Sequence, residues 1–218
     1  MPAIPDRADI ILPATPENVR RAAEAVRAGE LAIVPTETVY GVAARADAPE
    51  AMAKLYAAKG RDASKRVAFL AADLDAIRAA GVRVDAAAEK LATAFWPGPL
   101  TLVLQNAQGG WDGFRVPDHP VALAWLRELG FAPATTSANR SGEPAARTAR
   151  EAWAALAPHV ALALDAGPSP GGVASTVARV AAEGLEILRD GPIGREALAA
   201  AAGIPVLRKT FSAVLRRT

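Results

Sequence analysis

The feature that most constrains the fold of this chain is the passage from a short apolar run at residues 31–34 into the loop Pro35-Thr36-Glu37-Thr38-Val39-Tyr40-Gly41. Short apolar runs bounded by turn signals are typical of buried strands, and the proline ends this one. The pattern predicts a buried strand that brings hydroxyl groups and backbone amides to one end of a sheet. Sheet ends of this kind are where α/β proteins bind ligands.

Four positive side chains follow within eight positions: Lys59, Arg61, Lys65 and Arg66. The first two flank the glycine that is predicted to end a helix, where cations stabilise the helix dipole. Clustered cations also repel one another unless an anion joins them, and a phosphate group is such an anion. The sequence therefore leaves both a structural and a phosphate-binding role open for these residues.

Predicted strands and helices alternate along the rest of the chain. The predicted strands cover residues 67–70, 100–104, 114–116, 132–136, 161–165, 175–180 and 186–189. The last two are close in sequence, and we expect them to form an antiparallel pair. The alternation predicts an α/β fold (α+β in strict usage), in which helices flank a mixed sheet within one domain.

Two further features indicate binding groups. The loop Ser137-Ala138-Asn139-Arg140-Ser141-Gly142 follows a predicted strand. Ser137 lacks a G-x-S-x-G motif and an evident His or Asp partner, so the loop is interpreted as a hydrogen-bonding loop and not as a nucleophile. Arg115 alternates with apolar neighbours and points away from the face that they occupy. Its guanidinium group suits a carboxylate, because it can bind both oxygens.

Composition excludes several classes of site. The 218 residues include no cysteine, which excludes disulfides and thiolate catalysis. His119 is interpreted as a helix-start residue, and its spacing to His159 does not suit a metal site, so no metal ligands are predicted. No apolar run approaches a membrane span, and residues 1–11 lack a signal-peptide core. We expect a soluble, cytoplasmic protein that does not bind membranes.

Charge is nearly balanced, with 25 basic and 23 acidic residues. This balance does not demand a nucleic acid partner. After Glu196, however, the only charged side chains are Arg208, Lys209, Arg216 and Arg217. Such a basic tail suits contact with RNA, although a loose, solvated terminus explains it more simply.

Seven segments in order resemble the threonylcarbamoyl-AMP synthase (TsaC/YrdC) family in its single-domain form. They are residues 35–41, Lys59-Gly60-Arg61, Trp96-Pro97-Gly98-Pro99, Arg115-Val116-Pro117-Asp118-His119, Ser137-Ala138-Asn139 with Ser141-Gly142, Ser175-Thr176-Val177 and Leu188-Arg189-Asp190-Gly191. The chain departs from the family pattern at Asp62, where proline is frequent, and at Val67.

The resemblance implies a YrdC/RibB-like fold of three layers: a strongly twisted mixed β-sheet flanked by helices, with a large basic concavity. It also implies an N-terminal extension (1–13), a YrdC-like synthase domain (14–207) and a basic C-terminal tail (208–218). The implied activity is that of an L-threonylcarbamoyladenylate synthase, a nucleotidyltransferase. This enzyme condenses L-threonine, bicarbonate or CO2, and ATP to threonylcarbamoyl-AMP and pyrophosphate, for the threonylcarbamoyladenosine (t6A) modification of tRNA.

The resemblance further implies roles for matched residues. Lys59 and Arg61 belong to a lysine-x-arginine signature and are implied to be catalytic. The residues implied to bind ATP are Arg61, Lys65, Asn139, Arg147 and Arg189. The residues implied to bind threonine are Thr36 or Thr38, Arg115, Ser137 and Ser175. Attack of N-carboxythreonine on the α-phosphate requires two anions to be aligned, which positioning and cations achieve.

The resemblance implies Mg2+ carried by the nucleotide phosphates as the cofactor, with few or no dedicated protein ligands. It also makes tRNA and the proteins of a threonylcarbamoyl-transferase complex candidate partners. Two alternative functions stay open. One is an RNA- or ribosome-binding YrdC-like module without synthase activity, whose binding would depend steeply on salt. The other is a domain that uses a related carbamoyl-adenylate on another acceptor, although Arg115 and the paired hydroxyls favour an amino acid.

Overall fold

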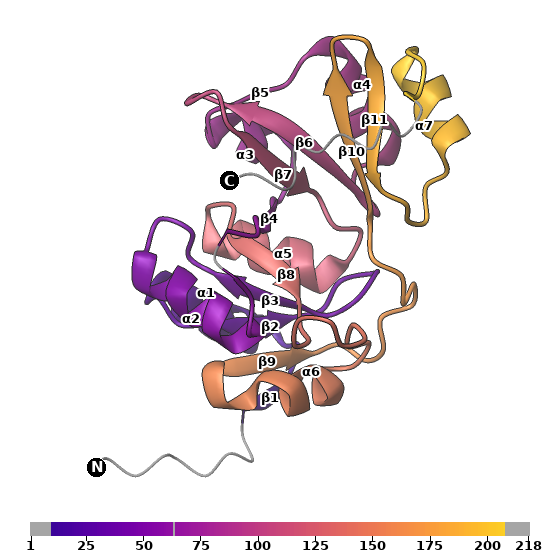
Figure 1. Cartoon of the computed structure of the whole chain (residues 1–218). Helices are drawn as coiled ribbons and strands as arrows, with labels where there is room; N and C mark the ends of the chain where they lie inside the picture. Colours follow the sequence, from indigo (N-terminus) through magenta and orange to yellow (C-terminus); the bar gives the residue numbers. More distant parts are fainter. Residues whose placement is uncertain (1–9, 63, 208–218) are drawn as a thin grey trace.

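Strand pairing joins segments from the whole length of the chain into one open sheet (Figure 1). The computed structural model describes residues 10–62 and 64–207. The strands are β1 (Ile11–Pro13), β2 (Ala32–Val34), β3 (Gly41–Ala44), β4 (Ala68–Leu70), β5 (Val82–Arg83), β6 (Leu100–Asn106), β7 (Trp111–Arg115), β8 (Ala134–Ser137), β9 (Leu162–Asp165), β10 (Thr176–Ala181) and β11 (Gly184–Arg189). The helices are α1 (Pro16–Arg27), α2 (Pro49–Lys59), α3 (Leu74–Ala79), α4 (Ala86–Phe95), α5 (Pro120–Leu129), α6 (Ala149–Leu156), the 3-10 helix η2 (Ala157–His159) and α7 (Arg195–Ala202).

The sheet is mixed, as predicted. Its strand order is β1-β9-β2-β3-β8-β4-β7-β6-β10-β11, and β5 pairs with β6. Parallel pairs join β1 to β9, β2 to β9, β4 to β7 and β6 to β10, and the other pairs are antiparallel. The predicted antiparallel pairing of the last two strands is confirmed in β10 and β11.

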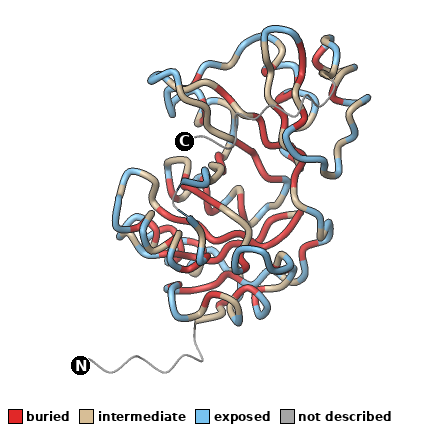
Figure 2. The backbone as a smooth tube through the Cα atoms, in the orientation of Figure 1, coloured by how far each residue is buried: buried red, intermediate tan, exposed pale blue. Residues whose placement is uncertain are grey.

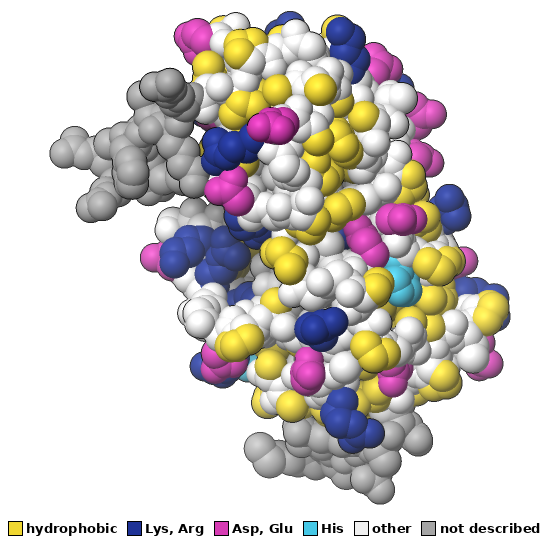
Figure 3. Space-filling view, turned by 90° about the vertical axis from the view of Figure 1, so that its right-hand side faces the viewer, with side chains coloured by type: hydrophobic (Ala, Val, Ile, Leu, Met, Phe, Trp, Pro, Cys, Tyr) yellow, Lys and Arg dark blue, Asp and Glu magenta, His cyan; other side chains and the backbone are white. Residues whose placement is uncertain are grey.

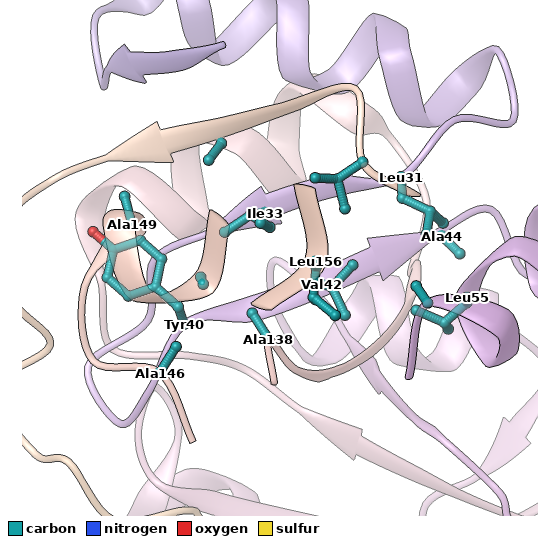
Figure 4. Packing of buried hydrophobic residues seen from close by; sticks show 14 of the residues in the cluster. Leu31, Ile33, Tyr40, Val42, Ala44, Leu55, Ala138, Ala146, Ala149 and Leu156 are labelled. Atoms are coloured by element: carbon teal, nitrogen blue, oxygen red, sulfur yellow. The ribbon is translucent and has the colours of Figure 1, made fainter. Parts of the chain in front are cut away.

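The strands in the lower part of Figure 1 are covered by helices on both faces. In β2, Ile33 packs with α2 and α6, whereas Ala32 and Val34 face α1 and α5. Figure 4 shows Tyr40 in the first of these layers, between Ala146 and Ala149. Burial on both faces explains why the strand is an unbroken apolar run, and it confirms the predicted three layers.

The upper part of the sheet is covered on one face only. Leu100, Leu102 and Leu104 of β6 pack with α3, α4 and α7. The intervening Thr101 faces the opposite side, as does Arg115 of β7, so polar side chains line that face. Figure 2 shows that backbone in the interior of both parts is buried. This face is nevertheless buried at Thr101 and Arg115, because the loop that carries Thr38 lies against it.

Helix ends follow the sequence signals. Thr15 caps α1, where its hydroxyl accepts a hydrogen bond from the amide of Asn18, and Gly60 ends α2 in the left-handed conformation. Thr148 and Glu151 form a complete capping box at α6. The end of α2 at Gly60 places Lys59 and Arg61 on either side of a helix end, as predicted.

Several features were not predicted or stay untested. The sequence predicts no strand at β3, because Gly-Val-Ala-Ala is a weak strand signal and its pairing with β2 and β8 decides its conformation. β1 lies within the stretch assigned to the N-terminal extension. The basic tail, residues 208–218, lies outside the described residues. No helix among the described residues is long and apolar enough to cross a membrane.

The large basic concavity also stays a prediction. Two surface hollows, of about 390 and 310 Å³, contain none of the predicted site residues. One lies between α4 and the β10–β11 turn, and the other lies between the end of α1 and α2. Figure 3 shows charges of both signs interspersed over one face, in keeping with the near balance of the composition.

Substitution of Leu55 tests whether core packing holds α2, the helix that carries Lys59. Leu55 is fully buried in α2, so Leu55→Ala should lower the free energy of unfolding by about 2–5 kcal/mol. Urea denaturation followed by circular dichroism measures this change. Leu188→Ala is the matched control, since Leu188 is 47% exposed and its truncation should stay within about 0.5 kcal/mol. Equal effects of the two substitutions would contradict this account of the core.

Candidate functional site

The loop between β2 and β3 is held by its own hydroxyl groups. Thr36 Oγ1 donates to Val39 O at 2.6 Å and lies 2.9 Å from Thr38 Oγ1. A hydroxyl has one proton to donate, so Thr38 must be the donor to Thr36. The backbone amides of Thr38 and Val39 also approach Thr36 Oγ1, each at 3.3 Å. Thr36 therefore shapes the loop, and Thr38 keeps its oxygen available as an acceptor.

Arg115, at the end of β7, is the donor to Thr38. Its Nη1 donates to Thr38 Oγ1 at 2.8 Å, and its Nε donates to Gly98 O at 3.1 Å. Its Nη2 lies 2.5 Å from Glu37 Oε1 in an ion pair whose side chains are 8% and 15% exposed. Both chain neighbours of Arg115 lie in the apolar core, which confirms that its side chain points to the opposite face.

Ser175 and Arg189 lie close to Arg115. Nε and Nη2 of Arg189 donate to Ser175 O at 3.0 and 2.8 Å, and Nη2 also donates to Ser175 Oγ at 3.0 Å. Ser175 Oγ is 2.8 Å from Thr101 Oγ1. Burial of the Arg189 guanidinium, and then the positive charge of Arg115, lower the pKa of Arg189. An anion bound beside these two cations would relieve their repulsion.

A glycine permits this arrangement. A Cβ atom at Gly191 would lie 2.7 Å from the carbonyl carbon of Ser175 and 2.8 Å from Ala174 O. Real Cβ atoms do not approach backbone this closely. Glycine therefore lets the chain after β11 pass against the start of β10, where Arg189 reaches Ser175.

The segment between β9 and β10 lies against the polar loop, along the right side of Figure 1. The amides of Gly171 and Gly172 donate to the carbonyl oxygens of residues 37 and 38, at 2.8 and 2.7 Å. Ser169 Oγ donates to Thr36 O at 2.8 Å. These bonds fix the backbone of the polar loop from the side of the molecule that carries β9.

Lys59 lies buried at the end of α2, with 3% of its surface exposed. Its Nζ donates to Ser137 O at 2.5 Å, to Asn139 Oδ1 at 3.2 Å, and to Asn139 O. Burial, and then the positive charge of Arg61, lower the pKa of Lys59 to about 8, so the ammonium form prevails at neutral pH. Three acceptors match the three N–H groups of an ammonium, so Lys59 clamps the second polar loop.

The amide group of Asn139 is used within the same loop. Its Nδ2 donates to Arg140 O and Glu143 O, both at 2.8 Å. Arg61, partly buried, donates from Nη2 to Arg66 O at 2.7 Å, while its Nε has no hydrogen-bond partner among the described residues. Arg61 is thus the member of this group with a buried donor still available.

The structure therefore brings most predicted residues into two groups. The first joins Thr36, Thr38, Arg115, Ser175 and Arg189, and the second joins Lys59, Arg61, Ser137 and Asn139. The groups are connected through β3, since Gly41 pairs with Ser137 and Ala138 N donates to Tyr40 O at 2.8 Å.

Two predicted residues lie outside these groups. Lys65 is exposed, and its carbonyl oxygen accepts a hydrogen bond from the Tyr56 hydroxyl at 3.3 Å. Arg147 lies against the segment between β9 and β10, where its Nη2 is 3.4 Å from Ser169 O. Gly172 leaves room for that guanidinium group, because a Cβ atom there would lie 2.7 Å from Arg147 Nε.

Sequence reasoning assigned no role to Glu37, Thr101 or Ser169. Glu37 had a visible signal, because a carboxylate between two hydroxyls in a predicted buried loop is unusual. Nothing in the local sequence indicates a role for Thr101 or Ser169. The pairing of β6 with β10 brings Thr101 to Ser175, and the segment that follows β9 brings Ser169 to Thr36. His119 begins α5, as predicted. The described residues contain no group of three or more His, Cys, Asp or Glu that could hold a metal ion.

The sequence is similar to one protein family and to named members of it. The family model Sua5_yciO_yrdC, described as "Telomere recombination", matches residues 24–191. Over 189 residues the chain is 39% identical to a Mycobacterium tuberculosis protein provisionally named as a threonylcarbamoyl-AMP synthase, covering 83% of this chain and 87% of that protein. The Bacillus subtilis protein named threonylcarbamoyl-AMP synthase is 36% identical over 196 residues, or 85% of this chain and 57% of that protein.

The fold also matches solved structures. The crystal structure of Pyrococcus abyssi Sua5 complexed with L-threonine aligns with a TM-score of 0.83 and 30% identity, covering 91% of this chain and 61% of that one. The crystal structure of Escherichia coli YciO aligns with a TM-score of 0.75 at 22% identity, covering 87% of this chain, and shows the shared fold alone. The chain thus spans about three fifths of the Pyrococcus Sua5 chain.

The clamp formed by Lys59 can be tested by stability. Lys59→Met keeps the length of the side chain but leaves buried acceptors unpaired, so it should lower the free energy of unfolding by about 1–3 kcal/mol. The control is Lys65→Met at an exposed position, which should change it by less than about 0.5 kcal/mol. Urea denaturation measures both. A Lys59→Met protein as stable as wild type would show that the clamp does not hold the loop.

Lys59 should also make stability depend on pH. Its pKa is about 8 in the folded protein and about 10.4 in an unfolded chain. Between these values the unfolded chain binds the proton more than the folded protein does, so the contribution of Lys59 to the free energy of unfolding should rise by about 1 kcal/mol per pH unit. Urea denaturation of wild type and Lys59→Met across this range isolates the effect. Parallel stability curves for the two proteins would contradict it.

Proposed function

Because the chain belongs to the Sua5/YciO/YrdC family, we propose that it is an L-threonylcarbamoyladenylate synthase acting in t6A modification of tRNA. In this reaction the threonine nitrogen bonds to the carbon of bicarbonate with loss of water. An oxygen of the N-carboxy group then attacks the α-phosphorus of ATP, and pyrophosphate leaves. The enzyme is on this proposal a nucleotidyltransferase with ATP, L-threonine and bicarbonate as substrates.

The observation that carries the proposal is the fixed orientation of Arg115. Hydrogen bonds to Gly98 O and Thr38 Oγ1 hold its guanidinium from two sides, and its Nη2 forms an ion pair with Glu37. A guanidinium held in this way is prepared to bind a carboxylate. The hydroxyl groups of Thr38 and Ser175 lie within the same group of residues and suit the hydroxyl and carboxylate of threonine.

Catalysis by this site rests on positioning and on positive charge. Arg61 has a buried Nε without a hydrogen-bond partner, and we assign it to the ATP phosphates. Arg189, which lies near Arg115, is assigned to the same nucleotide. Lys59 and Asn139 act through the loop that they hold, which presents Ser137. Preorganised cations stabilise charge that develops on the transferred phosphoryl group.

Mg2+ enters this proposal with its substrate. Since the described residues hold no carboxylate or histidine cluster that could bind an ion, phosphate oxygens and water are the expected ligands. The ion supplies charge neutralisation at the phosphates, while the chain's own cations orient them. Proteins that carry threonylcarbamoyl groups to tRNA, and tRNA itself, are the partners that this product requires.

Turnover of site variants tests the proposal. Wild type should release pyrophosphate from ATP and bicarbonate only when L-threonine is present, with threonylcarbamoyl-AMP as the product identified by mass spectrometry. Arg61→Ala should lower kcat/KM by about 100-fold or more while the protein stays folded. The control is Arg78→Ala, which removes an exposed arginine paired with Asp75 and Glu89 and should keep full activity. Normal turnover by Arg61→Ala would overturn the assignment of this site.

A further inference from the structure

Ser169 joins two parts of the protein that are distant in sequence. It lies in the crossing segment, residues 166–175, which runs from β9 in the lower part of the sheet to β10 in the upper part (Figure 1). Ser169 is 2% exposed. Its hydroxyl donates to Thr36 O at 2.8 Å, and its amide donates to Arg147 O at 2.8 Å. Its carbonyl oxygen accepts a hydrogen bond from Arg147 Nη2 at 3.4 Å. One buried serine therefore bonds both to the loop between β2 and β3 and to Arg147.

The crossing segment holds the loop between β2 and β3 at three successive residues. The carbonyl oxygens of residues 36–38 accept, in order, from Ser169 Oγ and from the amides of Gly171 and Gly172, at 2.8, 2.8 and 2.7 Å. Of these three donors, Ser169 Oγ alone belongs to a side chain. A substitution at Ser169 can thus remove one of the three bonds without changing the backbone.

Arg147 packs on the same segment. Gly172 has a φ of +67°, and a Cβ atom there would lie 2.7 Å from Arg147 Nε and 2.8 Å from Arg147 Cζ. Glycine therefore lets the guanidinium group approach the backbone closely. Because the amide of Gly172 also donates to Thr38 O, Thr38 and Arg147 both contact this one glycine.

Tyr40 anchors the start of the crossing segment. Its hydroxyl donates to Gly167 O at 2.7 Å and accepts from the amide of Ala166 at 3.2 Å. Burial raises the pKa of Tyr40, so the hydroxyl keeps its proton and remains a donor. Asp165 Oδ1 accepts a further hydrogen bond from the amide of Gly167 at 2.9 Å. The segment is thus fixed before it reaches Ser169.

We propose that Ser169 is a positioning residue that aligns the loop between β2 and β3 with Arg147. This proposal rests on the proposed synthase function, with Thr38 assigned to threonine and Arg147 to ATP by their match to the family. The reaction requires an oxygen on the amino-acid side to meet the α-phosphorus of ATP. The two sides of the site must therefore be held in register with each other. Ser169 acts on this register through Thr36 O and Arg147.

An effect on kcat distinguishes this role from a purely structural one. Loss of the Ser169 hydroxyl leaves Thr36 O without its side-chain donor, which lowers stability whether or not the serine aligns the site. The loop nevertheless keeps the hydrogen bonds among Thr36, Thr38 and Val39. A purely structural role would consequently leave kcat unchanged at temperatures where the protein is fully folded, whereas an aligning role lowers kcat.

The test is Ser169→Ala, with initial rates of threonine-dependent pyrophosphate release and isothermal titration calorimetry of L-threonine on the same folded protein. Misaligned reactants should lower kcat by about 10- to 100-fold. The dissociation constant of L-threonine should stay within about threefold of wild type, since the loop keeps its own hydrogen bonds. Thr93→Ala is the matched control. It removes an exposed hydroxyl that also donates to a backbone carbonyl, Glu89 O at 2.9 Å, and it should keep full kcat.

Tyr40→Phe gives a second measurement with Ser169 intact. It keeps the aromatic ring between Ala146 and Ala149 (Figure 4) and removes only the hydroxyl that anchors residues 166–167. It should lower kcat in the same direction as Ser169→Ala. If Ser169→Ala does not fold, the kcat of Tyr40→Phe decides the proposal.

Other outcomes overturn the proposal. An unchanged kcat in folded Ser169→Ala would show that the serine serves the fold alone. A loss of L-threonine affinity as large as the loss of kcat would show that Ser169 only shapes the threonine side. If wild type releases no pyrophosphate with threonine, the proposed synthase function fails, and the alignment fails with it. Normal wild-type turnover with unchanged kcat in both variants would overturn the alignment alone.

Discussion

The site depends above all on the pairing of β3 with two neighbours. β3 pairs with β2 on one side and with β8 on the other, so the loop that precedes it and the loop that follows β8 emerge at adjacent positions of the sheet. The register joins Gly41 to both Val34 and Ser137. A slip of one residue would turn every side chain of β3 to the opposite face and separate the two loops. Burial on both faces prevents such a slip.

Two buried cations have different physical functions in this arrangement. Lys59 is surrounded by three oxygen acceptors and fixes the second polar loop, so it acts on substrates through Ser137 and Asn139. Arg115 is fixed at two of its nitrogens but faces a carboxylate at the third. Lys59 thus stabilises a loop, whereas Arg115 is held among the hydroxyl and carboxylate groups of the site itself. This distinction separates a residue that supports the site from one that lies within it.

Much of the fold followed from local signals. The apolar run before Pro35, the caps at Thr15, Gly60 and Thr148, and the close spacing of the last two strands each have a local physical cause, and the structure confirms them. β3 could not be predicted, because its residues favour no conformation strongly and its pairing partners are distant in sequence. The partners of Arg115 were equally hidden, since Thr38 is 77 residues away along the chain.

The sequence by itself determined which chemistry was available: hydroxyl loops at predicted strand ends, cations beside a helix end, no cysteine, and seven segments in the order of one enzyme family. These features depend on residue types and short spacings. Only the tertiary structure decided which of those groups are used within the protein and which are left for a ligand. It paired Lys59 with three oxygens, and it left Nε of Arg61 without a hydrogen-bond partner among the described residues. Hydrogen-bond satisfaction depends on neighbours that only folding brings together.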